Sequence, residues 1–249
     1  MAGNNLTVTA SSVSAGENAL LSAGNDLSLN AAATHQTQSD RTRETHTTGA
    51  VVSTVAAGDN LTLSSRRDIP SQAAKIAVEN NITLQAGRDV NLLAEASTED
   101  NSNISKNKKE INESIRQQGT EIASGGQSTI VAGRDVTAQG SSVTAKGNIG
   151  VAAGRDVSLN TATESDYYYK DQTKTKKGFH SKKTTYTIEE DSATREKGSL
   201  LSGDNVSVST GNNLLAERFC GRWRRRCGPF CRRQCEHPGG DQYRHHLAI

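Results

Sequence analysis

Large side chains are scarce in this sequence. Aromatic residues make up 4% of the 249 positions and apolar residues 33%, which is little for the core of an ordinary globular protein. No run approaches 18 apolar residues, so no transmembrane segment is expected. Charged residues are near the average at 22%, which argues against disorder driven by charge. The abundant residues are Gly, Ala, Ser, Thr, Asn and Val, which suit stacked β-coils in which each coil covers its neighbour.

Cysteine is absent from residues 1–217. All four cysteines lie in residues 218–249, with the single tryptophan and two of the three prolines. This tail also holds eight arginines and two acidic residues, so it carries a net charge of +6 and the rest of the chain carries −4. A body without cysteine suits an exported repeat protein that needs no disulfide bonds.

A short phrase recurs in residues 1–217: Gly, two polar residues, an aliphatic residue, and then alternating residues. Gly3 and Gly24 are 21 residues apart, and so are Gly133 and Gly154. The alternation predicts short strands with one side buried, and Gly with Asn or Asp supplies turns because these residues tolerate positive φ. The predicted repeat turns lie at Gly3, Gly24, Gly58, Gly87, Gly133, Gly154, Gly203 and Gly211.

A unit of about 21 residues fits one coil of three short strands, with coils stacked at roughly 4.8 Å. The sequence therefore predicts an all-β fold, a right-handed parallel β-helix over residues 1–217, followed by an irregular tail. No amphipathic helix follows the strands, which argues against α/β folds. An antiparallel sandwich is the alternative, but a phrase that recurs at one corner of the coil favours a solenoid.

Three polar segments lack the phrase and are predicted to protrude from the β-helix as insertions. They are approximately residues 34–50, 96–124 and 163–199. In the second, the apolar residues from Ile104 to Ile122 have near-helical spacing, so a short surface helix is an alternative there.

The third insertion is predicted to be a long hairpin that gathers most of the aromatic residues beside several lysines. Aromatic side chains flanked by Lys suit a membrane interface or a partner surface. The alternative is that they pack against one another across the hairpin. The candidate partner-binding residues are Tyr167, Tyr168, Tyr169, Lys176, Lys177, Phe179 and Tyr186.

The phrases Ala23-Gly24-Asn25-Asp26-Leu27 and Ala153-Gly154-Arg155-Asp156-Val157 resemble the haemagglutinin repeats of filamentous-haemagglutinin-like proteins, passengers of two-partner secretion. The resemblance covers residues 1–217. Residues 167–198 are most similar to the second repeat block of contact-dependent growth inhibition effectors.

This resemblance implies a structural shaft of a large secreted or cell-surface bacterial adhesin or toxin-delivery protein, mediating attachment or toxin presentation. It implies an outer-membrane transporter and a target-cell surface or outer membrane as partners, and no enzymatic activity, cofactor, metal or specific nucleic acid. The sequence shows no secretion or toxin domain, and Met1–Leu6 does not read as a signal peptide. We therefore expect this chain to remain cytoplasmic if it is expressed alone.

The tail begins abruptly after Glu217, where the residue alphabet changes to Arg, Cys, His and Pro. A permissible back-translation of the tail, read one base later, restores Leu-Ser-Ala-Gly-Asp-Ser-Val, which is close to Leu21–Leu27. Our hypothesis is that residues 218–249 arise from a shifted reading frame, that the chain is a truncated fragment, and that the tail is disordered. The DNA sequence of the gene tests this.

Particular residues also allow two other function classes. The tail offers a zinc site or nucleic-acid binding, but the cysteines lack the paired C-x2-C spacing of zinc sites. The pairs Arg88-Asp89, Arg134-Asp135 and Arg155-Asp156 allow a β-helical carbohydrate-active enzyme, but Asn25-Asp26 occupies the same coil position, which favours turns and surface ion pairs. The tail candidates are Cys220, Cys227, Cys231, Cys235, His237, His245 and His246 for zinc, and Arg222, Trp223, Arg224, Arg225, Arg226, Arg232 and Arg233 for nucleic acid.

Overall fold

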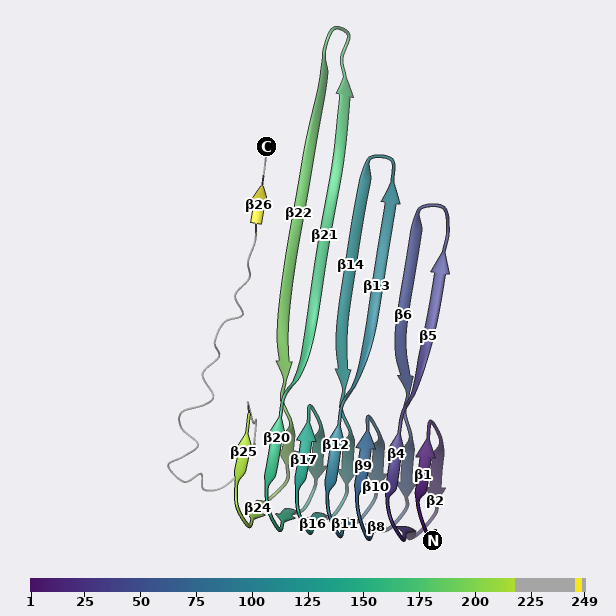
Figure 1. Cartoon of the computed structure of the whole chain (residues 1–249), viewed down its shortest axis with the longest axis vertical. Helices are drawn as coiled ribbons and strands as arrows, with labels where there is room; N and C mark the ends of the chain where they lie inside the picture. Colours follow the sequence, from purple (N-terminus) through teal and green to yellow (C-terminus); the bar gives the residue numbers. More distant parts are fainter. Residues whose placement is uncertain (218–244, 248–249) are drawn as a thin grey trace.

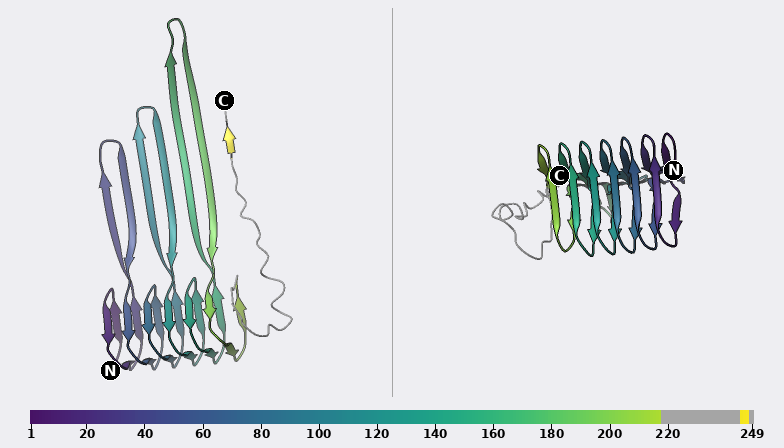
Figure 2. Two further views of the ribbon diagram at one scale, coloured as in Figure 1. Left: turned by 180° about the vertical axis from the view of Figure 1, so that it is seen from behind. Right: turned by 90° about the horizontal axis from the view of Figure 1, so that it is seen from below.

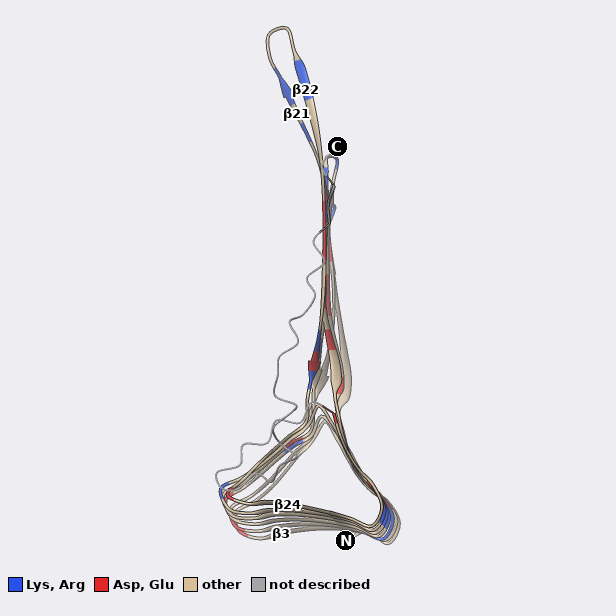
Figure 3. Ribbon diagram, turned by 90° about the vertical axis from the view of Figure 1, so that its left-hand side faces the viewer, with Lys and Arg blue, Asp and Glu red and all other residues tan. Residues whose placement is uncertain are grey.

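The chain folds as a parallel β-helix with a free-standing sheet rising from one of its corners (Figure 1). The computed structural model describes residues 1–217 and 245–247, which contain strands and no helix. The coils wind in the right-handed sense around a triangular cross-section (Figures 1 and 3). Because strands on each of the three shaft faces pair in parallel, the predicted β-helix is confirmed and the antiparallel sandwich is excluded.

Each face of the shaft is one parallel sheet with one strand per coil. Sheet 1 contains β1 (Leu6–Thr9), β4 (Leu27–Asn30), β9 (Ile69–Gln72), β12 (Val90–Leu93), β17 (Val136–Gln139), β20 (Val157–Asn160) and β25 (Leu214–Ala216). Sheet 2 contains β2 (Ser12–Ala15), β7 (Thr54–Ala57), β10 (Lys75–Val78), β15 (Glu121–Ser124), β18 (Ser142–Ala145) and β23 (Leu200–Ser202). Sheet 3 contains β3 (Ala19–Ala23), β8 (Leu61–Ser65), β11 (Ile82–Ala86), β16 (Ser128–Ala132), β19 (Ile149–Ala153) and β24 (Val206–Thr210).

The core of the shaft consists of aliphatic side chains stacked on their equivalents in the next coil. Alternate residues of each strand point inward, and the register sets Leu63 on Leu84 and Leu84 on Ile130. These three side chains are at most 1% exposed, and burial of each contributes about 1.5–3 kcal/mol. Successive coils lie side by side along the shaft when it is viewed from below (Figure 2). The small core therefore needs few aromatic residues.

The glycines of the repeat phrase occupy two corners, so the expectation of a single corner was wrong. Gly58 and Gly203 follow strands of sheet 2 and lead into sheet 3, a position that we call the Asn corner. The other six lie between sheet 3 and sheet 1, which we call the Arg/Asp corner: Gly3, Gly24, Gly87, Gly133, Gly154 and Gly211. The phrase is shared because both corners make the same tight turn between strands.

Insertions leave the shaft only at the third corner, between sheets 1 and 2, and only in every second coil. In the intervening coils this hairpin corner is a short turn at Ala10, Ala73 or Gly140, each with positive φ of 48–53°. In the other coils it opens into a hairpin (Figure 1). The hairpins are β5 (Ala32–Ser39) with β6 (Arg43–Val51), β13 (Glu95–Ser105) with β14 (Lys108–Gln118), and β21 (Ala162–Lys177) with β22 (Lys182–Lys197).

The three hairpins pair with one another into a single antiparallel sheet, which we call the hairpin sheet. Strand β6 pairs with β13, and β14 pairs with β21. One hairpin supplies two strands for every two coils, so strands at about 4.8 Å match the rise of the shaft beneath them. The surface helix considered between Ile104 and Ile122 was wrong, because this segment forms β13, β14 and the start of β15.

A buried hydroxyl closes the base of every hairpin. The Oγ of Ser53, just after β6, lies 3.0 Å from the carbonyl oxygen of Val8 and 2.6 Å from that of Asn30. Thr120 and Ser199 occupy the same place after β14 and β22, and each hydroxyl also faces two carbonyls, at 2.9–3.2 Å. All three residues are at most 1% exposed. The hydroxyl proton gives these carbonyls a further donor, since those of Asn30, Leu93 and Asn160 also accept from the amides of Ala10, Ala73 and Gly140.

Most of the tail lies outside the described residues. Strand β26 (His245–Leu247) is described and pairs antiparallel with Ile188–Glu190 of β22. Of the zinc candidates, His245 and His246 lie in β26. The other zinc candidates, the nucleic-acid candidates and the rest of the tail for which disorder is predicted lie outside the described residues, and these stay predictions.

Candidate functional site

The candidate partner-binding residues divide between the middle and the tip of the longest hairpin. Tyr167, Tyr168 and Tyr169 lie in the middle of β21, between β14 and β22. Lys176 and Lys177 end β21, and Phe179 lies in the turn, 96% exposed. Tyr186 lies on β22 and is 62% exposed. The structure therefore does not bring all seven residues into one patch.

The three tyrosines are held by contacts within the hairpin sheet, as the self-packing alternative requires. The Tyr167 hydroxyl donates to Glu190 Oε1 at 3.2 Å, and the Tyr168 hydroxyl donates to Glu110 Oε1 at 3.3 Å. The Lys109 ammonium lies 5.6 Å from the centre of the Tyr169 ring. Burial raises the pKa of the Tyr167 and Tyr168 phenols above their ordinary values, and the glutamates add to it, so both phenols stay protonated donors.

The two faces of the hairpin sheet differ in chemistry. Residues directly opposite one another in an antiparallel pair share a face, and faces alternate along each strand. By this rule Ile111 shares a face with Tyr169, and Asp171 shares the same face with Ile188. This face, which we call the apolar face, carries Ile104, Ile111, Ile115, Tyr167, Tyr169, Tyr186 and Ile188.

The opposite face is polar and is crossed by ion pairs between hairpins. Arg116 of β14 binds Asp166 of β21, and Arg195 of β22 reaches the same carboxylate at 3.1 Å. Lys170 binds Glu189 at 2.9 Å, which raises the pKa of the lysine. A shallow depression on this face is lined in part by Glu99, Asn101, Asn112, Asp166, Tyr168 and Asp191. The carboxylate of Asp166 thus pairs with two arginines, one from the second hairpin and one from the third.

The tip of the longest hairpin is basic and stands beyond its neighbours (Figure 3). Cross-strand pairing with β14 stops at Gln172, so β21 and β22 continue alone. Lys176 lies opposite Lys183, and Lys177 lies opposite Lys182. Like charges directly opposite one another oppose pairing, so this arrangement does not stabilise the hairpin itself. No acidic residue occurs between Asp171 and Glu189.

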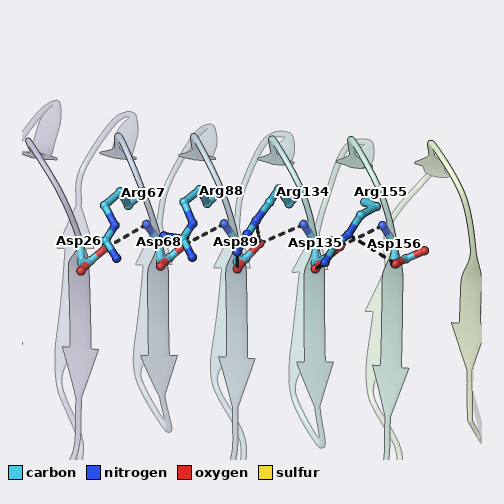
Figure 4. Close-up of polar contacts among 9 residues, drawn as sticks. All are labelled: Asp26, Arg67, Asp68, Arg88, Asp89, Arg134, Asp135, Arg155 and Asp156. Atoms are coloured by element: carbon cyan, nitrogen blue, oxygen red, sulfur yellow. Dashed lines mark hydrogen bonds and ion pairs between the residues drawn. The ribbon is translucent and has the colours of Figure 1, made fainter.

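The Arg-Asp pairs of the sequence form a ladder along the Arg/Asp corner (Figure 4). Each arginine pairs with the aspartate of the preceding coil, as Arg88 does with Asp68 at 3.5 Å. Arg134 Nε lies 3.0 Å from Asp89 Oδ1, and Arg155 Nε lies 2.9 Å from Asp135 Oδ1. The bond from Arg155 lowers the pKa of Asp135. The surface ion pairs that the sequence favoured at this position are confirmed.

The same aspartates also form a backbone ladder. The amides of Asp89, Asp135 and Asp156 each donate to the Oδ1 of the aspartate one coil below, at 3.1–3.3 Å. Asn5 accepts from the Asp26 amide in the same way. At the Asn corner, asparagines take this role without charge, as Asn60 does for Asn81 at 3.2 Å. The aspartates thus accept hydrogen bonds that join successive corners. This is the turn chemistry that the sequence favoured over catalysis.

Comparison with known proteins decides the family. The model of the hemagglutinin repeat matches residues 1–44, 36–111 and 103–215. These matches include all three hairpins and nearly all of the shaft. The chain belongs to the hemagglutinin-repeat family.

Several curated relatives contain the same hemagglutinin-repeat segment. The chain is 56% identical over 216 residues, 87% of its length, to "tRNA nuclease CdiA" of Escherichia coli strain STEC_O31. It is 62% identical over 144 residues, 58% of its length, to "16S rRNA endonuclease CdiA" of Enterobacter cloacae subsp. cloacae. It is 62% identical over 210 residues, 84% of its length, to "tRNA nuclease CdiA" of Escherichia coli O6:K15:H31. The matches span only 4–7% of the length of these relatives. No solved structure matches the chain.

Sequence reasoning missed two features of this hemagglutinin-repeat segment. The pairing between hairpins joins residues 50 positions apart, such as Thr48 with Thr98, and no local pattern reports it. The buried hydroxyls do leave a signal, because Ser53, Thr120 and Ser199 each stand two residues before an inward aliphatic residue. Among residues 1–217 and 245–247 there is neither a membrane-spanning helix nor a cluster of three potential metal ligands.

Proposed function

We propose that this segment is a non-enzymatic shaft module of a large secreted toxin-delivery protein of the contact-dependent growth inhibition class. One observation carries the proposal. Relatives whose names give different targets, tRNA in one case and 16S rRNA in another, share this segment at 56–62% identity. A segment common to proteins with different substrates does not set the substrate, so we place the nuclease activity of such proteins outside it.

The geometry supports a shaft. Seven stacked coils at roughly 4.8 Å each give a rod of about 30 Å, and each coil contacts only its neighbours, so rods of any length can be built from the same unit. On this proposal, the parent protein leaves the cell through an outer-membrane transporter of two-partner secretion and acts at a target-cell surface.

The hairpin tip is the part of the module that we propose contacts the target cell. Its five lysines include two like-charged cross-strand pairs that no described carboxylate compensates. The exposed ring of Phe179 lies in the turn between them. A basic tip with an exposed aromatic residue fits an anionic envelope surface, where each lysine near the surface contributes about 1 kcal/mol. The lysines are Lys174, Lys176, Lys177, Lys182 and Lys183.

Vesicle sedimentation tests the tip. The purified chain is expected to bind vesicles containing phosphatidylglycerol and not vesicles of phosphatidylcholine, and to lose binding as salt is raised. The variant Lys176→Gln, Lys177→Gln, Lys182→Gln, Lys183→Gln should lose binding while keeping its circular dichroism spectrum. The matched control replaces the shaft lysines, Lys75→Gln and Lys146→Gln, and should bind normally. Equal binding by the tip variant would refute the contact.

An activity assay tests the shaft assignment separately. The purified chain is expected to leave tRNA, ribosomal RNA and DNA intact under conditions in which a nuclease control digests them. Cleavage that co-purifies with the chain and disappears in a point variant of residues 1–217 would overturn the non-enzymatic assignment.

A further inference from the structure

The depression on the polar face of the hairpin sheet lies across the seam between the second and third hairpins, and we call it the seam depression. Its volume is about 340 Å³, at the lower end of the range for ligand pockets. Residues directly opposite one another on β13, β14, β21 and β22 form two rows of its lining. The row nearer the shaft contains Glu99, Ser114, Asp166 and Ala193, and the next row toward the tip contains Asn101, Asn112, Tyr168 and Asp191.

Small residues beside a leaning aromatic ring explain why the sheet is hollowed here. Ser114 and Ala193 are the smallest residues of the two rows. The hydroxyl of Tyr168 donates to Glu110 at 3.3 Å, and Glu110 lies one row nearer the tip. The ring therefore leans away from the row of Ser114 and turns one side toward the depression. The result is a floor of small residues with an aromatic wall.

Part of the lining is held in place by contacts within the sheet. Two arginines fix the carboxylate of Asp166. Asn101 accepts a hydrogen bond from Thr45 at 2.8 Å and donates one to Glu99 at 2.9 Å. These contacts orient the side chains before a ligand arrives, which lowers the entropic cost of binding.

Three other polar side chains of the seam depression are free to bind a ligand. Among residues 1–217 and 245–247, the side chains of Asn112, Ser114 and Asp191 make no hydrogen bond or ion pair. Asn112 and Asp191 flank Tyr168 in one row, two strand spacings or about 9–10 Å apart. An amide or a hydroxyl both donates and accepts, whereas a carboxylate only accepts. Groups of this kind around an aromatic ring suit a ligand that carries several hydroxyl groups.

A sugar ring has that chemistry. Its hydroxyl groups lie around the rim and both donate and accept, and its C–H groups form an apolar face that packs on an aromatic ring. The carboxylates of Glu99 and Asp191 pair with no cation in the described part of the chain, so they repel a sugar acid. A divalent cation fits less well, because the described residues contain no cluster of three potential metal ligands.

We propose that the seam depression binds an uncharged sugar, with one face of the sugar ring on Tyr168 and its hydroxyl groups on Asn112, Ser114 and Asp191. Two of these residues come from the second hairpin and two from the third, so the site exists only where the hairpins pair. It lies nearer the shaft than the basic tip of the third hairpin. Sugar binding therefore holds or fails independently of the proposed contact between that tip and an anionic surface.

Saturation-transfer NMR on the full chain under reducing conditions tests the proposal. The probes are glucose, galactose, mannose, N-acetylglucosamine and glucuronic acid, each at millimolar concentration. We expect at least one neutral sugar to receive saturation from the chain, and glucuronic acid to give a weaker signal or none. The variant Asn112→Ala, Asp191→Ala should lose the signal several-fold with an unchanged circular dichroism spectrum. Ser114→Gln, which fills the floor and removes no charge, should lose it as well.

The matched control is Asn103→Ala, Asp171→Ala, which removes the same two types of side chain from the same hairpins but outside the seam depression. It should bind like the original chain, and so should the tip variant that lacks four lysines. The proposal is overturned if no neutral sugar receives saturation or if glucuronic acid binds as well as the best neutral sugar. It is also overturned if the two depression variants bind like the control, which assigns the sugar to another part of the chain.

Discussion

At the scale of single residues, most glycines of the Arg/Asp corner lie where one coil closely approaches the next, although one coil carries Arg66 at this position. A Cβ on Gly133 would overlap the carbonyl oxygen of Gly87 in the coil below. Gly133→Ala is therefore expected to destabilise the chain by about 1–3 kcal/mol, seen as a lower midpoint in thermal unfolding. Gly150→Ala is the control, because a Cβ there meets nothing within 4 Å, and it should be neutral or slightly stabilising. Equal loss in both would contradict the steric explanation.

The Arg/Asp ladder makes stability depend on pH. Because the bond from Arg155 lowers the pKa of Asp135 in the folded chain, the ionised form stabilises the fold above the ordinary carboxylate range, and this contribution is lost as pH falls through the lowered pKa. Urea unfolding at a series of acidic pH values should show this loss. In Asp135→Asn the amide oxygen can still accept from the Asp156 amide, as Asn5 accepts from Asp26, but the charge is gone. This variant should be less stable near neutrality and have a smaller pH dependence; an unchanged pH dependence would refute the role of Asp135.

At the scale of elements, the buried hydroxyls fix where each hairpin leaves the shaft. In Ser199→Ala, the carbonyls of Ala138 and Asn160 lose the buried hydroxyl donor, while Asn160 still accepts from the Gly140 amide at 3.2 Å. We expect a loss of about 0.5–1.5 kcal/mol. Hydrogen exchange should accelerate at the base of β21 and β22 before it changes in β11 and β16. Exposed Ser192, replaced by alanine, is the control, and equal effects of the two substitutions would argue against the hydroxyl contact.

The elements also show why sequence reasoning succeeded for the shaft and failed in part for the insertions. A coil repeats its neighbours, so the alternation around Leu27 or Val157 reports both strand and burial. In the second insertion the spacing of Ile111 and Ile115 is four, which puts both side chains on one face of a strand as well as of a helix. The strand is decided by pairing with β13 and, about 55 positions away, with β21, which the spacing does not report.

Which corner a turn occupies was also hidden in the sequence. Gly58 and Gly87 begin the same phrase, yet they lie at different corners. The coil that contains Gly58 has Arg66 at its Arg/Asp corner, where the other coils have glycine. The repeat phrase therefore does not show this corner in that coil. The candidate tyrosines were correctly placed on a hairpin, but the sequence could not report that the neighbouring hairpin covers part of them.

At the scale of the whole molecule, the spacing of hairpins along the shaft couples the shaft to the hairpin sheet. Residues 133–153 form one coil without a hairpin, and their removal would join Ala132 to Gly154 in the repeat phrase. The hairpins of β13–β14 and β21–β22 would then leave adjacent coils. Four strands would have to stand over two coils, at about half of the 4.7–4.9 Å that paired strands need. We expect the hairpin sheet to break at this seam although the shaft junction is intact.

The matched control removes more of the chain but keeps the spacing. Deleting residues 87–153 takes out one coil with its hairpin and one without, joins Ala86 to Gly154, and sets β21 beside β6 in antiparallel sense. Thermal unfolding followed by circular dichroism, with hydrogen exchange on β21 and β22, compares the two. The shorter deletion should lose protection in the third hairpin and melt at the lower temperature, since it forfeits cross-hairpin pairing that the longer deletion restores. If the shorter deletion keeps its hairpins protected, the sheet does not depend on the two-coil spacing, and the hairpins are independent projections of the shaft.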